Sequence, residues 1–148
     1  MHRITILLPL LLCLFCTGLS AQTPSPHDIK PGNPIRKTLL DVVRKPTVAE
    51  LGQNVEFVVS TMRVKGNWAF VYGQLQQPGG QALDHSKFKD KDYREMSEGG
   101  IFDNNFQAVL QKQKGKWVIV KRALGCTDVC WLEWLDLKGA PKEIFPNG

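Results

Sequence analysis

Two cysteines near the C-terminal end have a spacing that could support disulfide, redox or metal chemistry. Cys126 and Cys130 are four positions apart, which at a helix start can bring the two α-carbons within the roughly 7 Å that a disulfide allows. A redox pair normally has two intervening residues rather than three, and the nearby Asp128 disfavours a thiolate. A metal site would need further ligands, but His27 and His85 are distant in the sequence. We expect a structural disulfide worth about 2 kcal/mol; redox-active or metal-bound thiols are the alternatives.

The segment Gln76–Asn104 is long for a simple connection, and function often resides in such loops. It contains Asp84, His85 and Ser86 in direct succession, which suggests a hydrolytic triad. Three adjacent side chains point apart, however, and cannot relay a proton as a triad does. We expect a solvated run of charges with room for one helical turn, or a partner-binding loop.

Aromatic side chains give a second candidate site. If Trp131 or Trp134 is exposed beside Tyr72, these rings form a platform for a small molecule or a glycan; otherwise they belong to the core and its rim. Asp128 is expected to cap the last helix, a role worth about 1 kcal/mol, with a role in a site as the alternative. The candidate binding surface comprises Tyr72, His85, Tyr93, Asp128, Trp131 and Trp134.

Few strand residues could act as acids or bases. The predicted strands carry mainly apolar side chains, and the ionisable or phenolic exceptions are Glu56, Arg63, Tyr72 and Arg122. Charged side chains on strands usually face solvent. We therefore assign no catalytic residue, and we expect no cofactor and no bound metal.

Residues 1–21 have the order of a cleavable signal peptide. Positive charge at His2 and Arg3 precedes an apolar run, Ile4–Phe15, and small residues follow up to Ala21, where we place the cleavage. The apolar run is shorter than the roughly 20 residues that span a bilayer. We therefore expect a periplasmic or secreted protein that does not span the membrane.

The predicted export changes the cysteine count and the charge. Cys13 and Cys16 are discarded with the signal peptide, and an oxidising compartment favours a disulfide between the remaining two cysteines. Loss of Arg3 leaves 18 basic against 14 acidic residues, so the net charge falls from +5 to about +4. The charges are spread along the chain without an arginine-rich stripe, which argues against nucleic-acid binding. We expect a monomer.

Composition and periodicity predict the elements. Residues 22–32 are rich in proline and polar residues, which indicates a flexible linker before a single domain of residues 33–148. Asn33 and Pro34 begin an amphipathic helix, Pro46 bends or ends it, and Gly52 stops the run.

Alternating residues then predict four strands. The first strand, from Asn54, places Val59 on one face and Met62 on the other, and a turn leads into Trp68–Leu75. The second hairpin comprises 105–113 and 116–124, and a short helix runs from Thr127 or Asp128 to about Lys138. The fold class is α+β: an N-terminal helix, a four-stranded antiparallel sheet of two hairpins joined by a long loop and covered on one face, and a short C-terminal helix.

Two phrases carry a resemblance. Trp68-Ala69-Phe70-Val71 and the phrase of residues 125–131 resemble a group of small exported bacterial proteins with no assigned activity, over roughly 34–141. In that group small or apolar residues stand at the positions of Cys126 and Cys130, so the disulfide is an addition to the pattern. The order of elements is also similar to cystatin-like and NTF2-like folds, in which a curved sheet wraps a helix. This second likeness is topological, and such folds host both enzymes and binding modules.

These observations predict a small exported binding or accessory domain without catalysis of its own. Its partner would be a protein, a small molecule or a glycan of the cell envelope. The alternative is an NTF2-like enzyme or small-ligand binder that uses a pocket inside the curved sheet. A deep pocket with a converging Asp, His or Tyr would favour the enzyme, whereas a filled core with exposed aromatic residues would favour binding.

Overall fold

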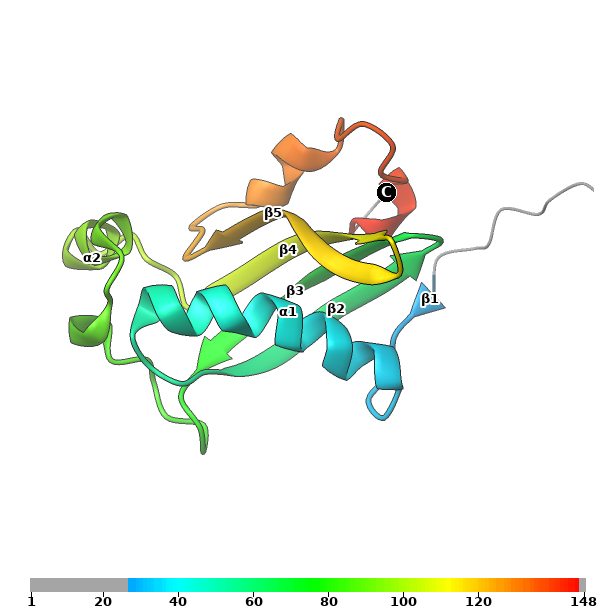
Figure 1. Ribbon diagram of the computed structural model, residues 1–148. Coiled ribbons are helices and arrows are strands. Elements are labelled where there is room, and N and C mark those ends of the chain that lie inside the picture. The colour runs from blue at the N-terminus through cyan, green and yellow to red at the C-terminus, as the bar shows by residue number, and fades with distance from the viewer. Residues whose placement is uncertain (1–26, 147–148) are drawn as a thin grey trace, which may run out of the picture.

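The computed structural model describes residues 27–146 and has the predicted α+β class (Figure 1). One antiparallel sheet has the strand order β1-β2-β3-β4-β5. The predicted signal peptide and residues 22–26 lie outside the described residues. The helices and strands are β1 (His27–Asp28), α1 (Pro34–Leu51), β2 (Glu56–Lys65), β3 (Trp68–Gln76), α2 (Lys91–Glu98), β4 (Asn105–Gln113) and β5 (Lys116–Leu124).

The N-terminal helix α1 has the ends that the sequence predicts. The Asn33 side chain accepts a hydrogen bond from the backbone N–H of Ile35, and Gly52 ends the helix with a left-handed φ of 64°. Pro46 does not end α1, which continues to Leu51. The buried positions recur every fourth residue and so form one apolar stripe facing the sheet: Leu39, Val43, Thr47 and Leu51.

The sheet curves around α1 because strands β2 and β5 each carry an irregularity. The register of β2 shifts between Val59 and Thr61, and that of the β4–β5 pair shifts between Val109 and Leu110. A bulge adds one residue and bends the strand. It also reverses the alternation, so Met62 packs in the same core as Val59 rather than on the opposite face. The prediction for Met62 was therefore wrong.

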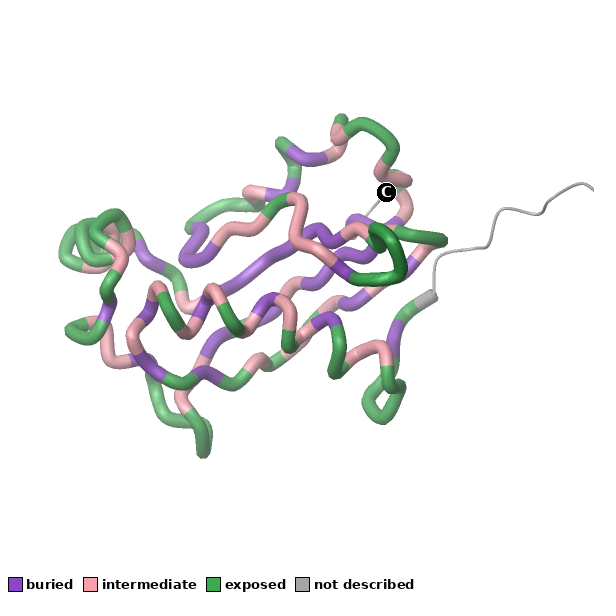
Figure 2. Tube along the Cα trace, viewed as in Figure 1, coloured by how far each residue is buried: buried purple, intermediate pink, exposed green. Residues whose placement is uncertain are grey.

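The central strands β3 and β4 separate two cores. Ala69, Val71, Phe106 and Ala108 lie in the cluster that includes α1, whereas residues between them in sequence face the other way. Figure 2 shows buried residues concentrated along these strands. The second cluster consists of Phe70, Val109, Trp131, Trp134, Ile144 and Phe145.

The C-terminal segment, residues 125–146, covers the sheet face opposite α1. Arg63 of β2 donates a hydrogen bond to the carbonyl oxygen of Phe145 (2.7 Å), and Lys65 forms an ion pair with Glu143. The sheet is therefore covered on both faces, and the expectation of a single covered face was wrong.

The predicted C-terminal α-helix is also replaced by shorter structure. Within the span predicted as helix, only Cys130–Trp134 is helical, and it forms a 3₁₀-helix. A separate 3₁₀ turn follows at Lys142–Ile144. Trp131 and Trp134 must both bury against the sheet, and a 3₁₀-helix with three residues per turn places them on the same side. Val129, not Asp128, precedes this helix, and no side chain caps it.

The long connection between β3 and β4 contains more structure than one helical turn. A 3₁₀ turn, His85–Lys87, precedes α2. The backbone N–H groups of Asp92 and Tyr93, in the first turn of α2, donate to the side chain of Asp90. The connection is fixed to the end of α1, since the backbone N–H groups of Lys89 and Asp90 both donate to the carbonyl oxygen of Glu50. It is an ordered part of the fold.

Part of the predicted linker belongs to the sheet. Asp28 pairs with Arg63 of β2, and the N–H of Ile29, which is buried, donates to the carbonyl oxygen of Met62 (2.8 Å). The domain therefore begins several residues before Asn33. Between residues 27 and 146, the structure contains no helix with the length and apolar character needed to cross a bilayer.

Candidate functional site

The predicted disulfide is present and closes the loop that follows β5. The sulfur atoms of Cys126 and Cys130 are bonded, and their α-carbons are 6.2 Å apart, within the range that disulfides allow. The bond links the end of β5 to the first residue of the 3₁₀-helix Cys130–Trp134. It therefore holds residues 127–129 as a small exposed loop.

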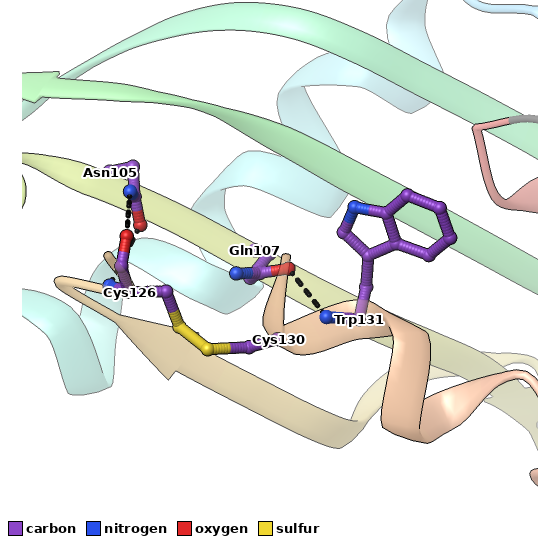
Figure 3. The surroundings of a disulfide bond; sticks show 5 residues. All are labelled: Asn105, Gln107, Cys126, Cys130 and Trp131. Carbon is purple, nitrogen blue, oxygen red and sulfur yellow. Dashed lines mark hydrogen bonds between the residues drawn. A yellow bond between two sulfur atoms is a disulfide. The ribbon is translucent and has the colours of Figure 1, made fainter. Parts of the chain in front are cut away.

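Two buried amide side chains of β4 fix this loop to the sheet (Figure 3). Asn105 donates to the carbonyl oxygen of Cys126 (2.6 Å) and accepts from its N–H (3.1 Å). Gln107 accepts from the N–H of Trp131 (3.0 Å). Both amides are almost fully buried, so these hydrogen bonds satisfy groups that would otherwise be costly to desolvate.

Gly125 makes the tight entry into the loop possible. Its φ is +71°, and a Cβ at this position would lie 2.3 Å from the ring of Phe102. Only glycine adopts this conformation without strain and leaves room for the ring. The loop therefore has a defined position relative to the connection that carries Phe102.

A hollow of about 270 Å³ lies between this loop and the strands. Two carboxylates, Asp103 and Asp128, line it, and its lining residues include no lysine or arginine. Hydroxyl and amide groups complete the wall. The lining residues are Tyr72, Gln74, Asp103, Asn105, Cys126, Thr127, Asp128 and Val129.

Two apolar side chains of the loop region are exposed. Val129 is 47% exposed and Leu132 is 51% exposed, although both are of a kind that proteins usually bury. Val129 also lines the hollow. The loop thus combines an acidic, polar hollow with an apolar rim. We call the residues that line the hollow, together with Leu132, the disulfide surface.

Of the six residues predicted for a binding surface, only Tyr72 and Asp128 lie in this hollow. Trp131 and Trp134 are buried, with 7% and 8% exposure, so the condition for an aromatic platform is not met. Trp131 packs edge-on against Phe70 and stacks with Phe145. The tryptophans anchor the C-terminal segment instead of presenting a ligand surface.

His85 and Tyr93 lie in the long connection and do not line this hollow. Both pack against Phe102, and His85 also packs against Phe88. Burial, and then the negative charge of Glu50, raise the pKa of the Tyr93 hydroxyl. The predicted surface is therefore divided between two regions.

The adjacent Asp84, His85 and Ser86 do not form a triad, as predicted. Ser86 donates its hydroxyl to Asp84 (2.6 Å) rather than to the imidazole. Hydrogen bonds from Ser86 and then from Lys87 lower the pKa of Asp84. Asp84 therefore acts as an ordinary cap of the 3₁₀ turn.

Sequence reasoning missed Asp103, Asn105 and Gln107. A signal for the amides was present: Asn105 and Gln107 alternate with Phe106 and Ala108, so β4 carries uncharged polar residues on one face of an otherwise apolar strand. Such residues on a central strand need partners, and here the partner is the disulfide-closed loop.

The concave side of the sheet, where the alternative hypothesis places a pocket, is occupied by α1. Leu39, Val43 and Leu51 of the helix and Phe106 of β4 have no exposed surface. The rings of Phe57 and Phe106 pack with centroids 4.4 Å apart. A ligand there would have to displace these side chains.

Comparison with known protein families, with curated proteins and with solved structures finds no match to the chain. Among residues 27–146, no group of three or more His, Cys, Asp and Glu side chains is arranged to hold a metal ion.

Proposed function

We propose that the protein is a small exported domain of the cell envelope that binds a partner through the disulfide surface. The observation that carries this proposal is the construction of the surface. A disulfide, two buried amides and a glycine hold an exposed loop whose own side chains contribute little to the core. Rigid presentation of exposed groups lowers the entropic cost of binding.

The charge of the hollow indicates the ligand chemistry. Asp103 and Asp128 line it without a basic neighbour, on a chain whose net charge is positive. Carboxylates form their strongest hydrogen bonds with charged donors. The ligand would therefore present an ammonium or guanidinium group to the hollow and an apolar group to Val129 and Leu132. A basic side chain of an envelope protein, or an amino sugar of a glycan, has this chemistry.

The proposal also includes export from the cytoplasm and a relationship to other small exported proteins. A disulfide that needs an oxidising compartment supports periplasmic or secreted localisation. The curved antiparallel sheet around α1 supports a relationship to cystatin-like or NTF2-like folds, and the phrases at 68–71 and 125–131 support kinship with small exported proteins. Mass spectrometry of the exported protein should find Gln22 at its N-terminus.

Site-specific photo-crosslinking tests the binding surface. A benzophenone amino acid in place of Val129 should give a crosslinked product in the cells that make the protein. Val58 is the matched control, because it is also a valine with 47% exposure but lies on β2. Equal crosslinking at the two positions, or none at position 129, would contradict the proposal.

Two charge variants sharpen the test. Asp128→Asn, made together with the crosslinker at position 129, should lower the yield of the product because the hollow loses one of its two carboxylates. Asp136→Asn removes the same charge from an exposed side chain outside the hollow, which forms only a surface ion pair with Lys142, and should leave the yield unchanged. If both variants behave alike, the hollow does not contact the ligand.

A further inference from the structure

The connection between β3 and β4 brings two polar side chains, of Ser97 and Asn104, to the imidazole of His85. The hydroxyl oxygen of Ser97, in the last turn of α2, lies 2.7 Å from Nδ1 of His85. The amide oxygen of Asn104 lies 2.9 Å from Nε2 of the same ring. Ser97 and Asn104 are 12 and 19 positions from His85, so the fold rather than local sequence assembles the group.

When His85 is neutral, the hydrogen-bonding capacities of its two partners give the direction of both bonds. An amide oxygen can only accept, so Nε2 of a neutral His85 carries the proton and donates it to Asn104. Nδ1 then has a free lone pair, and the hydroxyl of Ser97 donates to it. A serine whose proton points at an imidazole, with the imidazole held by a third group, is the arrangement that activates a nucleophile.

The imidazole is held firmly from its sides. Its ring centroid lies 4.8 Å from that of Phe88 and 5.5 Å from that of Phe102, and both phenylalanines are buried. A catalytic base must keep its orientation while it exchanges a proton, and packing of this kind supplies that rigidity.

The group is also accessible. His85 and Ser97 line an open hollow of about 450 Å³, together with Arg94 and Glu98. Nη1 of Arg94 donates to the carbonyl oxygens of Phe88 (3.1 Å) and Lys89 (3.2 Å), which fixes the guanidinium beside this hollow. Its remaining N–H groups supply positive charge for the negative charge that develops on a carbonyl oxygen under attack. None of these residues belongs to the disulfide surface.

We infer that Ser97 is a nucleophile towards small carboxylic esters, with His85 as its general base and Asn104 as a positioning residue. The Oγ of Ser97 bonds to the acyl carbon while its proton moves to Nδ1 of His85. The bond from that carbon to the alcohol oxygen breaks, and the alcohol leaves with the proton from Nδ1. Water then cleaves the acyl-serine, which releases the acid and restores the Ser97 hydroxyl. This activity goes beyond the binding function proposed above.

A fluorophosphonate probe tests this inference, because it phosphonylates activated serines and releases fluoride. The wild-type chain should gain one phosphonyl group, which peptide mass spectrometry should locate on Ser97. Ser97→Ala should abolish the labelling. Ser86→Ala is the matched control, since the Ser86 hydroxyl lines the same hollow but donates to Asp84. The Ser86→Ala variant should be labelled on Ser97 at the wild-type rate.

Two further substitutions distinguish chemistry from structural support. His85→Phe keeps an aromatic ring between Phe88 and Phe102 but removes the base, and should slow labelling on the order of 100-fold. Asn104→Leu should slow it by up to about 100-fold through misplacement of the imidazole, whereas Asn104→Asp keeps the accepting oxygen and should restore the rate. Thermal unfolding of each variant confirms that it is folded.

The wild-type experiment needs no variant and is decisive by itself. An unlabelled Ser97 in the wild-type chain would overturn the inference and leave His85 as a structural link between α2 and the start of β4. Hydrolysis of p-nitrophenyl acetate gives an independent reading. The wild-type protein should hydrolyse this ester faster than Ser97→Ala, and equal rates of hydrolysis would likewise contradict the proposal.

Discussion

The two faces of the sheet are covered by different physical means. On one face, a regular helix packs an apolar stripe against apolar strand residues, including Leu39 and Phe106. On the other, an irregular segment is held by two tryptophans, a disulfide and hydrogen bonds from individual side chains such as Asn105 and Arg63. A helix satisfies its own backbone groups, but an irregular segment needs partners from elsewhere.

This difference explains where the exposed loop lies. The α1 face has no room for a loop with solvent-facing side chains, because the helix residues that pack on the sheet, from Leu39 to Leu51 at every fourth position, have no exposed surface. On the opposite face, specific anchors fix a few backbone atoms and leave the side chains between them free. Val129 and Asp128 are examples, between an anchor at Cys126 and one at Trp131. Binding surfaces are therefore expected on the irregular face.

Truncation of Leu39 should have the largest effect on stability. Leu39 has no exposed surface, and replacing such a leucine with alanine removes contacts and leaves a cavity, at a cost of about 2–5 kcal/mol. Urea unfolding measures the loss. Leu132→Ala, at an exposed site of the other face, should change the free energy of unfolding by less than about 0.5 kcal/mol. Similar losses for both variants would refute the contrast between the faces.

Asn105→Ala should destabilise less, and more locally. It leaves the N–H and carbonyl groups of Cys126 without their partner in a buried place, which costs about 1–3 kcal/mol. Amide hydrogen exchange should accelerate at Cys126 and Trp131 but not at Leu39. The control is Gln74→Ala, an exposed amide of the same hollow. Faster exchange throughout α1 would show that the two faces are not independent.

The sequence predicted the α1 face well because its signals are local. Asn33 and Gly52 mark the helix ends within one turn, and the apolar stripe between them is visible as a period. The bulge in β2 was invisible, because the run of apolar and small residues from Val58 to Thr61 fits either register. The last helix was overestimated, since Trp131 and Trp134 at a spacing of three suit both α and 3₁₀ geometry.

The candidate sites were predictable only where their residues are close in sequence. Cys126 and Cys130 are four positions apart, and their disulfide followed from spacing and compartment. Asp103 reaches the loop through the pairing of β4 with β5, and Ser97 reaches His85 through the placement of α2. These contacts depend on strand register and on the packing of Phe88 and Phe102, which no short sequence pattern specifies.

The smallest predicted effect concerns the ion pair that fastens the end of the irregular face. A hydrogen bond from Lys65, and then one from the backbone, lower the pKa of Glu143 below its ordinary value of 4.5. Because the folded state holds the carboxylate at a lowered pKa, the pair contributes stability above pH 4.5 and loses it as the pH falls through the folded value. The difference in the free energy of unfolding between wild type and Glu143→Gln should therefore narrow as the pH is lowered.

Chemical unfolding at a series of pH values below and above 4.5 measures this narrowing. Glu133→Gln changes an exposed carboxylate of the same segment and serves as the control. Glu143 is solvated, so the effect is small and should weaken further in high salt. A salt-insensitive difference between wild type and Glu143→Gln would mean that packing around Ile144 and Phe145, rather than charge, fastens the end of the chain. The irregular face would then depend on apolar burial as the α1 face does, and the contrast between the two would be one of regularity alone.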